Sequence, residues 1–215
     1  MIRYTAVLLY AWSAVALGAA VGDLSKVNGS LEVAAGDQAG DVSTVNGSVT
    51  IGASARVEAV DTVNGSVQID AGATADSAET VNGGIEIAER VAVSGGVSTV
   101  NGAITLGRGS KVQGSLETVN GRMTLEGAEV GDGISTVNGD IMVGTGSRVD
   151  GGIRVEKSSG WGWNWGRNKR PKVTIESGAV VNGTLEFERE VDLYVGEGVV
   201  LGEIKGVQPV RHALK

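Results

Sequence analysis

Short stretches in which hydrophobic and polar residues alternate recur along most of the chain. In residues 44–61, for example, Val49 and Ile51 alternate with polar neighbours, and two further apolar residues follow at Val57 and Val60. An alternation with a period of two is typical of a strand with one buried face. Gly, Ala, Ser and Asp separate the apolar stretches, so each unit of this length predicts three short strands joined by tight bends.

The tripeptide Val-Asn-Gly marks the repeat. It occurs in register seven times, at spacings of 18, 18, 18, 19, 19 and 18 residues. A fixed period near 20 residues predicts a solenoid. We therefore predict an all-β fold: a single-stranded parallel β-helix (a β-solenoid) with three short strands per 18–19-residue coil and about six to eight stacked coils.

The physics of such a coil assigns a structural role to the repeated asparagines. Each strand pairs with the equivalent strand of the next coil, about 4.8 Å away, and valines at equivalent positions stack in the interior. Asn-Gly is favoured where the backbone takes a positive φ, so each Val-Asn-Gly predicts a corner. Stacked amide side chains hydrogen-bond along such a corner. The predicted ladder consists of Asn28, Asn46, Asn64, Asn82, Asn101, Asn120 and Asn138.

The repeat breaks once and ends before the chain does. The alternation stops after Val155, resumes at Val173 and continues into an irregular coil that ends near Ile204. We predict a solenoid over residues 21–204 with an insertion at 157–172, followed by a loose C-terminal tail at 205–215.

The first twenty residues have the pattern of a secretory signal peptide. Arg3 supplies a positive charge, an apolar run follows from Ala6, and small residues close the run at Ala20. Such a segment is normally cleaved; an uncleaved membrane anchor is the alternative, although the run is shorter than the ~20 residues that a spanning helix needs. We predict a periplasmic or secreted protein whose mature chain has no integral membrane span.

Composition narrows the function classes. The chain has no cysteine, so disulfides, thiolate metal sites and thiol nucleophiles are excluded. The net charge of -7 makes the average surface acidic, which argues against nucleic acid as a partner. The single histidine, His212, lies near the C-terminus, and the acidic residues are scattered along the repeats. We therefore predict no enzyme activity, no catalytic or metal site and no cofactor.

The insertion is the candidate binding site. It combines three tryptophans with four basic residues in an otherwise acidic chain, and insertions in solenoids become surface loops. Aromatic rings with nearby cations suit glycan, lipopolysaccharide or anionic lipid. The alternative is that the tryptophans fold back and cover the solenoid. The candidate residues are Trp161, Trp163, Trp165, Arg167, Lys169, Arg170 and Lys172.

The threonines that precede six of the Val-Asn-Gly copies suggest a further, weaker hypothesis. They lie two residues before the asparagines, from Thr44 to Thr136. A flat Thr-x-Asn face of this kind is similar to the regular arrays of ice-binding solenoids, whereas turn chemistry is the simpler interpretation.

The Val-Asn-Gly-Ser-Val-x-Ile repeats over residues 24–204 resemble those of the bactofilins, bacterial polymer-forming cytoskeletal proteins, and of exported bacterial adhesin-type domains. The resemblance implies a right-handed β-helix and self-association. Bactofilins act at the cytoplasmic face, whereas the N-terminal pattern here indicates export. We therefore expect a non-enzymatic, adhesin-like scaffold of the cell envelope that self-assembles end to end, with a monomeric glycan- or lipid-binding module as the alternative.

Overall fold

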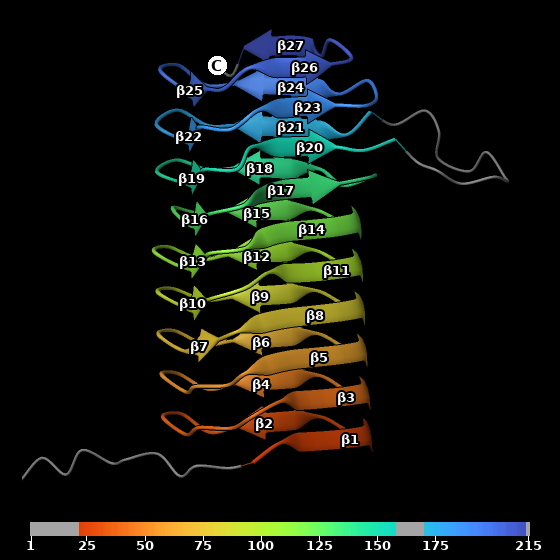
Figure 1. The fold of residues 1–215 in the computed structure, drawn as a ribbon, viewed down its shortest axis with the longest axis vertical. Helices are drawn as coiled ribbons and strands as arrows, with labels where there is room; N and C mark the ends of the chain where they lie inside the picture. The colour runs from red at the N-terminus through yellow and green to blue at the C-terminus, as the bar shows by residue number, and fades with distance from the viewer. Residues whose placement is uncertain (1–21, 158–169, 214–215) are drawn as a thin grey trace, which may run out of the picture.

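The computed structural model describes residues 22–157 and 170–213 of the chain. The predicted signal segment 1–20 lies outside the described residues. The described residues form an all-β solenoid of about nine turns, with coils of about 19 residues and three strands per turn, as predicted. Every strand pairing between neighbouring coils is parallel, and the coils stack in one column (Figure 1).

Three sheets run along the solenoid. The first sheet contains, in order, β1 (Leu24–Asn28), β3 (Val42–Asn46), β5 (Ala59–Asn64), β8 (Ser77–Asn82), β11 (Val97–Asn101), β14 (Ser115–Asn120), β17 (Gly133–Thr136), β20 (Ile153–Val155), β23 (Leu185–Phe187) and β26 (Ile204–Gly206). The second sheet contains β2 (Leu31–Val33), β4 (Val49–Ile51), β6 (Val67–Ile69), β9 (Ile85–Ile87), β12 (Ile104–Leu106), β15 (Met123–Leu125), β18 (Ile141–Val143), β21 (Lys172–Ile175), β24 (Asp192–Val195) and β27 (Val210–Ala213). The third sheet contains β7 (Thr74–Ala75), β10 (Ala92–Val93), β13 (Lys111–Val112), β16 (Glu129–Val130), β19 (Arg148–Val149), β22 (Val180–Val181) and β25 (Val200–Leu201).

The solenoid has more turns than the six to eight that the repeat predicted, for two reasons. The break after Val155 does not end a coil: β20 and β21 belong to the same coil, and the insertion replaces the corner between them. The C-terminal segment also continues the stack. We expected residues 205–215 to be loose, but β26 pairs with β23 and β27 pairs with β24. These pairings satisfy backbone groups that a loose tail would leave to water.

The core is a set of apolar columns that run along the axis. In the second sheet, Val49 pairs in register with Val67 and Val67 with Ile85, and all three are almost fully buried. Because every coil keeps its apolar residues at the same register, each inward side chain packs on its equivalents above and below. This continuous burial of aliphatic surface is the main stabilising contribution expected for such a fold.

The Val-Asn-Gly corners have a different backbone from the one predicted. Of the seven glycines in this tripeptide, only Gly29 has a positive φ. The others are required by close packing: a Cβ at Gly65 would lie 1.9 Å from the carbonyl oxygen of Gly47 in the preceding coil. The left-handed conformation occurs instead at the corner between the second and third sheets. There it recurs once per coil, mostly at glycine but also at Ser54 and Arg90.

The threonines and valines of the repeat lie on opposite sides of the first sheet. The threonines that precede Val-Asn-Gly point inward and are buried, and Thr62 donates a hydrogen bond to the carbonyl oxygen of Gly47 over 2.9 Å. The hypothesis that the threonines and asparagines form a surface array of the ice-binding kind is therefore wrong. The valine after each threonine points outward, because neighbouring strand residues face opposite sides.

Candidate functional site

The outer face of the first sheet carries two parallel columns of side chains. One, which we call the polar column, contains one outward residue from each of nine coils. Its in-register members are Ser43, Asp61, Glu79, Ser98, Glu117, Ser135, Arg154, Glu186 and Lys205.

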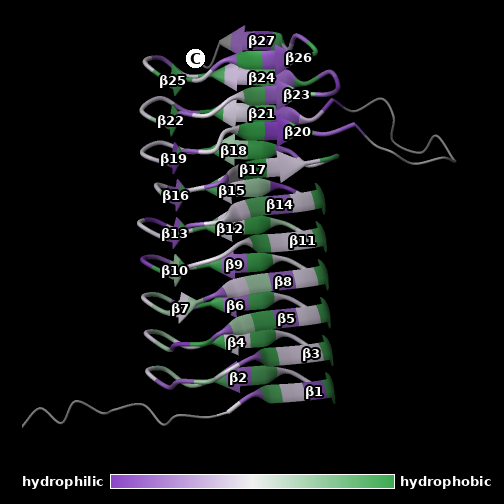
Figure 2. Cartoon of the chain, in the orientation of Figure 1, coloured by the Kyte–Doolittle hydropathy of each residue, from purple (hydrophilic) through white to green (hydrophobic). Residues whose placement is uncertain are grey.

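The second column lies two residues further along each strand, on the same outward face. We call it the valine stripe. Its exposed members range from 66% exposed at Val27 to 37% at Val119, with the four between at 39–40%. Figure 2 shows the hydrophobic colour near the ends of β1, β3, β5, β8, β11 and β14. The stripe consists of Val27, Val45, Val63, Val81, Val100 and Val119.

Three overlapping hollows connect these columns into one shallow groove, the outer groove. The first, of about 540 Å³, lies between Lys26 and Val100. The second, of about 230 Å³, shares Ser98 and Val100 with the first. The third, of about 580 Å³, shares Glu117 and Ser135 with the second and reaches Lys205. The groove therefore follows the axis of the solenoid along most of the first sheet.

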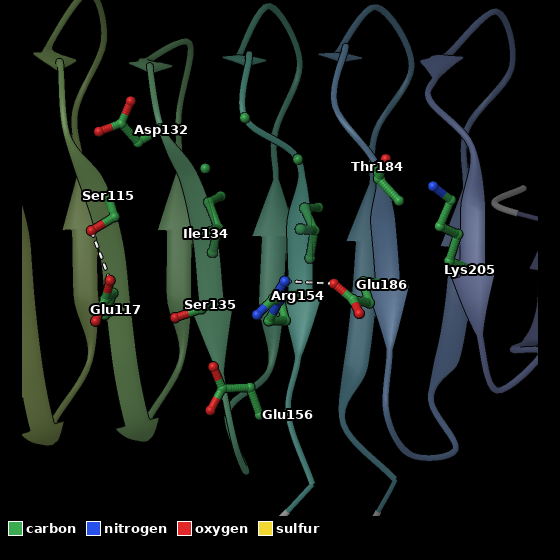
Figure 3. Close-up of a pocket in the computed structure, with 14 residues that line it drawn as sticks. Ser115, Glu117, Asp132, Ile134, Ser135, Arg154, Glu156, Thr184, Glu186 and Lys205 are labelled. Atoms are coloured by element: carbon green, nitrogen blue, oxygen red, sulfur yellow. Dashed lines mark hydrogen bonds and ion pairs between the residues drawn. The ribbon is translucent and has the colours of Figure 1, made fainter.

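The charge of the outer groove changes along its length. At the N-terminal part Asp61 and Glu79 are direct neighbours in register. Partial burial, with the nearby carboxylates of Glu79 and Asp41, raises the pKa of Asp61. At the C-terminal part, cations compensate the acids: Arg154 forms an ion pair with Glu186 at 2.6 Å, and Figure 3 shows the two side chains meeting on neighbouring strands.

The asparagines of the repeat form a hydrogen-bonded row at the corner that borders the groove. Each Nδ2 donates to the Oδ1 of the asparagine one coil earlier, over 2.9–3.0 Å. The row runs without a gap from Asn28 to Asn138. At Asn138, the last member, the donor is a guanidinium instead of an amide. Arg189 donates to Asn138 Oδ1 over 2.8 Å and to the carbonyl oxygen of Val137 over 3.1 Å. These amides are thus occupied by one another.

The structure places only two of the seven predicted loop residues. Trp161, Trp163, Trp165, Arg167 and Lys169 lie outside the described residues.

The two described cations contact the next coil. Arg170 forms ion pairs with Glu190 at 2.8 Å and with Asp192 at 3.8 Å. The Nζ of Lys172 lies 4.3 Å from the centre of the Tyr194 ring, which stacks on His212. The C-terminal base of the insertion is therefore attached to the solenoid by charge pairs and a cation–π contact.

The two ends of the solenoid differ in chemistry. At the N-terminal end, the inward positions of β1 and β2 include Leu24, Leu31 and Val33, which continue apolar columns. Among the described residues, no strand pairs with the outer edge of either strand. At the C-terminal end the column that contains Leu193 ends in Arg211, which is exposed. A charge thus occupies a position that is apolar in the preceding coils.

Within residues 22–157 and 170–213, no group of three or more histidine or acidic side chains could hold a metal ion. No helix in this part of the chain is long and apolar enough to cross a membrane. Sequence reasoning missed the outer groove, although one signal was available: Asp61 and Val63 are two residues apart in a strand and must share a face. Comparison with protein-family models, curated proteins and solved structures finds no match to this chain.

Proposed function

We propose that the mature chain is a non-enzymatic scaffold of the bacterial cell envelope that self-associates through its N-terminal end. The observation that carries the proposal is the contrast between the two ends. An unpaired strand edge with continuous apolar columns is a template for another copy. A charge in a core column, such as Arg211, opposes the same contact at the other end.

The N-terminal end has suitable chemistry for a symmetric contact. Leu24 is only partly buried, and Val27 is more exposed than its equivalents in later coils. Lys26 occupies the column of the buried threonines, which is polar from Thr44 to Thr136, so its charge interrupts no apolar column. Its Nζ donates to the carbonyl oxygen of Ser30 at the corner, over 3.1 Å. Two copies related by a twofold axis would bring identical edges together, the usual symmetry of protein dimers. The proposal is thus an end-to-end pair rather than an open filament.

Sedimentation equilibrium of the chain starting at Val21 tests this proposal. We expect a monomer–dimer equilibrium that is weakened by Leu24→Lys. The matched control is Ile204→Lys, which places the same charge in the same column at the C-terminal end. A monomer at all concentrations, or equal sensitivity to both substitutions, would refute association through the N-terminal end.

A second candidate function is the recognition of envelope glycan or anionic lipid by the insertion. It is supported by the place where the insertion leaves the solenoid, a surface corner at which Lys157 and Arg170 are both exposed. Deletion of residues 158–169 with a short glycine linker is expected to preserve the fold and remove binding to isolated envelopes. Unchanged binding of the deletion variant would exclude this function.

A further inference from the structure

The N-terminal part of the outer groove is both apolar and acidic, and no described part of the chain covers it. Val45, Val63 and Val81 are 39–40% exposed on three successive coils. Contiguous exposed aliphatic side chains on one face are uncommon unless a partner covers them. Asp61 and Glu79 lie beside them on the same strands, and no cation forms an ion pair with either carboxylate among the described residues.

The arrangement favours a long, thin partner. The polar column and the valine stripe both run perpendicular to the strands, so the groove follows the axis and repeats its chemistry once per coil. The backbone groups of the first sheet are already paired between coils. A partner therefore makes contact through side chains and lies along the axis, instead of adding a strand to a sheet edge.

The charge identifies the chemistry of the partner. The carboxylates of Asp61, Glu79 and Glu117 lie on the groove. Partial burial raises the pKa of Asp61, and the repulsion of its charge by the neighbouring acids Glu79 and Asp41 raises it further. A cation placed among them would relieve this repulsion, whereas a polyanion would add to it. The valine stripe adds a requirement for aliphatic surface beside the cations. A polypeptide meets both requirements, because basic and aliphatic side chains can follow one another along it.

We propose that the outer groove is a docking surface for an extended basic polypeptide segment in which lysine or arginine is interspersed with aliphatic residues. The segment lies along the solenoid axis, its cations against the polar column and its aliphatic side chains against the valine stripe. This inference is independent of the proposed pairing of N-terminal ends, because the groove and the end are separate surfaces.

The test uses the full mature chain and a fluorescently labelled twelve-residue peptide of four Lys-Val-Gly repeats. Such a peptide extends to about 40 Å, which spans about eight coils at ~4.8 Å each. Fluorescence anisotropy at low salt measures its binding. Three further peptides replace lysine with serine, valine with serine, or lysine with glutamate. We expect the original peptide to bind most tightly and each replacement to weaken binding, with the glutamate peptide weakest.

Variants of the chain locate the binding site. Asp61→Asn with Glu79→Gln removes two charges almost isosterically and is expected to weaken binding about tenfold. Val63→Ser with Val81→Ser is expected to weaken it severalfold without a change in salt dependence. The matched control is Glu32→Gln with Glu86→Gln, which removes two exposed carboxylates from the second sheet.

Three outcomes would overturn the inference. One is no measurable binding of the Lys-Val-Gly peptide. Another is an equal loss in the control variant, which would indicate attraction to the overall negative charge. The third is binding of the Lys-Ser-Gly peptide as tightly as the original, which would assign the groove to cations alone. Far-ultraviolet circular dichroism of each variant confirms that the fold is retained, and a failure of dimerisation at the N-terminal end leaves this result unaffected.

Discussion

The guanidinium of Arg189 donates a hydrogen bond to Oδ1 of Asn138 over 2.8 Å, although 51 residues separate the two in the chain. The asparagine row has a direction, because every amide nitrogen donates to the preceding coil. The last carbonyl oxygen therefore needs a donor from elsewhere. Arg189 supplies it after the insertion has replaced the next corner, so it closes the row where the repeat is interrupted.

Replacement of Arg189 by methionine is expected to destabilise the chain by about 1–2 kcal/mol, since a charged donor loses hydrogen bonds to two acceptors. Chemical denaturation with urea measures this change. The matched control is Arg108→Met, which alters an exposed arginine at the corner after β12 and is expected to stay within about 0.5 kcal/mol of the parent. Equal effects of both substitutions would mean that the contact with Asn138 contributes nothing specific.

Substitution by alanine is expected to destabilise the fold at both Gly72 and Gly65, but for different reasons. Gly72 has a φ of +73°, and a Cβ there would meet only the Ser54 hydroxyl at 3.5 Å, so Gly72→Ala carries mainly the left-handed backbone cost of about 1–2 kcal/mol. At Gly65 the added Cβ would lie 1.9 Å from a backbone oxygen of the neighbouring coil, which forces the coils apart. We expect Gly65→Ala to cost more and to lower the melting temperature further. A smaller effect at Gly65 than at Gly72 would contradict this ranking.

The stability of the chain should depend on pH through Asp61. Partial burial, with the charges of Glu79 and Asp41, raises the pKa of this carboxyl in the folded state above its ordinary value of 3.8. Between the two pKa values the folded state binds more protons than the unfolded state, so the free energy of unfolding falls as pH rises through this window. Asp61→Asn should therefore raise the melting temperature at pH 7, and the gain should vanish below about pH 3.8.

A double-mutant cycle checks the cause of that shift. Because the Glu79 charge contributes to it, the gain from Asp61→Asn at pH 7 should be smaller in a Glu79→Gln background. A gain that is the same at pH 3 and pH 7 would show that titration of Asp61 is not responsible.

Arg211→Leu should convert end-to-end pairs into longer assemblies. The substitution restores an apolar residue in the column that contains Leu193, so the C-terminal end would present continuous apolar columns and open strand edges like the N-terminal end. Sedimentation velocity and negative-stain electron microscopy should then detect filaments. The control is Lys205→Gln, which removes a charge at the same end from an outward position. Arg211→Leu particles of unchanged size would contradict a capping role.

The length of a coil and most of its buried positions were predictable, because the sequence itself repeats with the period of the coil. The tripeptide from Val45 to Gly47, repeated every 18 or 19 residues, determines the length of a coil. The alternation around Val49 and Ile51 determines which side chains are buried, since strand residues face opposite sides by geometry. The same tripeptide at Val181 occupies another corner, where Asn182 bonds to Asp150, so the motif alone does not specify its place.

The stacking of the coils determined three features that the period does not specify: the backbone of the corners, the direction of some side chains, and the contacts between coils. Val-Asn-Gly can form a corner by a positive φ or by close packing, and only the distance between Gly65 and the backbone of Gly47 selects the second. The direction in which Thr62 and Val63 point depends on where the strand begins relative to the corner. The outer groove and the contact between Arg189 and Asn138 join residues from different coils. A local sequence pattern determines conformation within one coil, whereas surfaces made by several coils depend on their register and on the insertion between them.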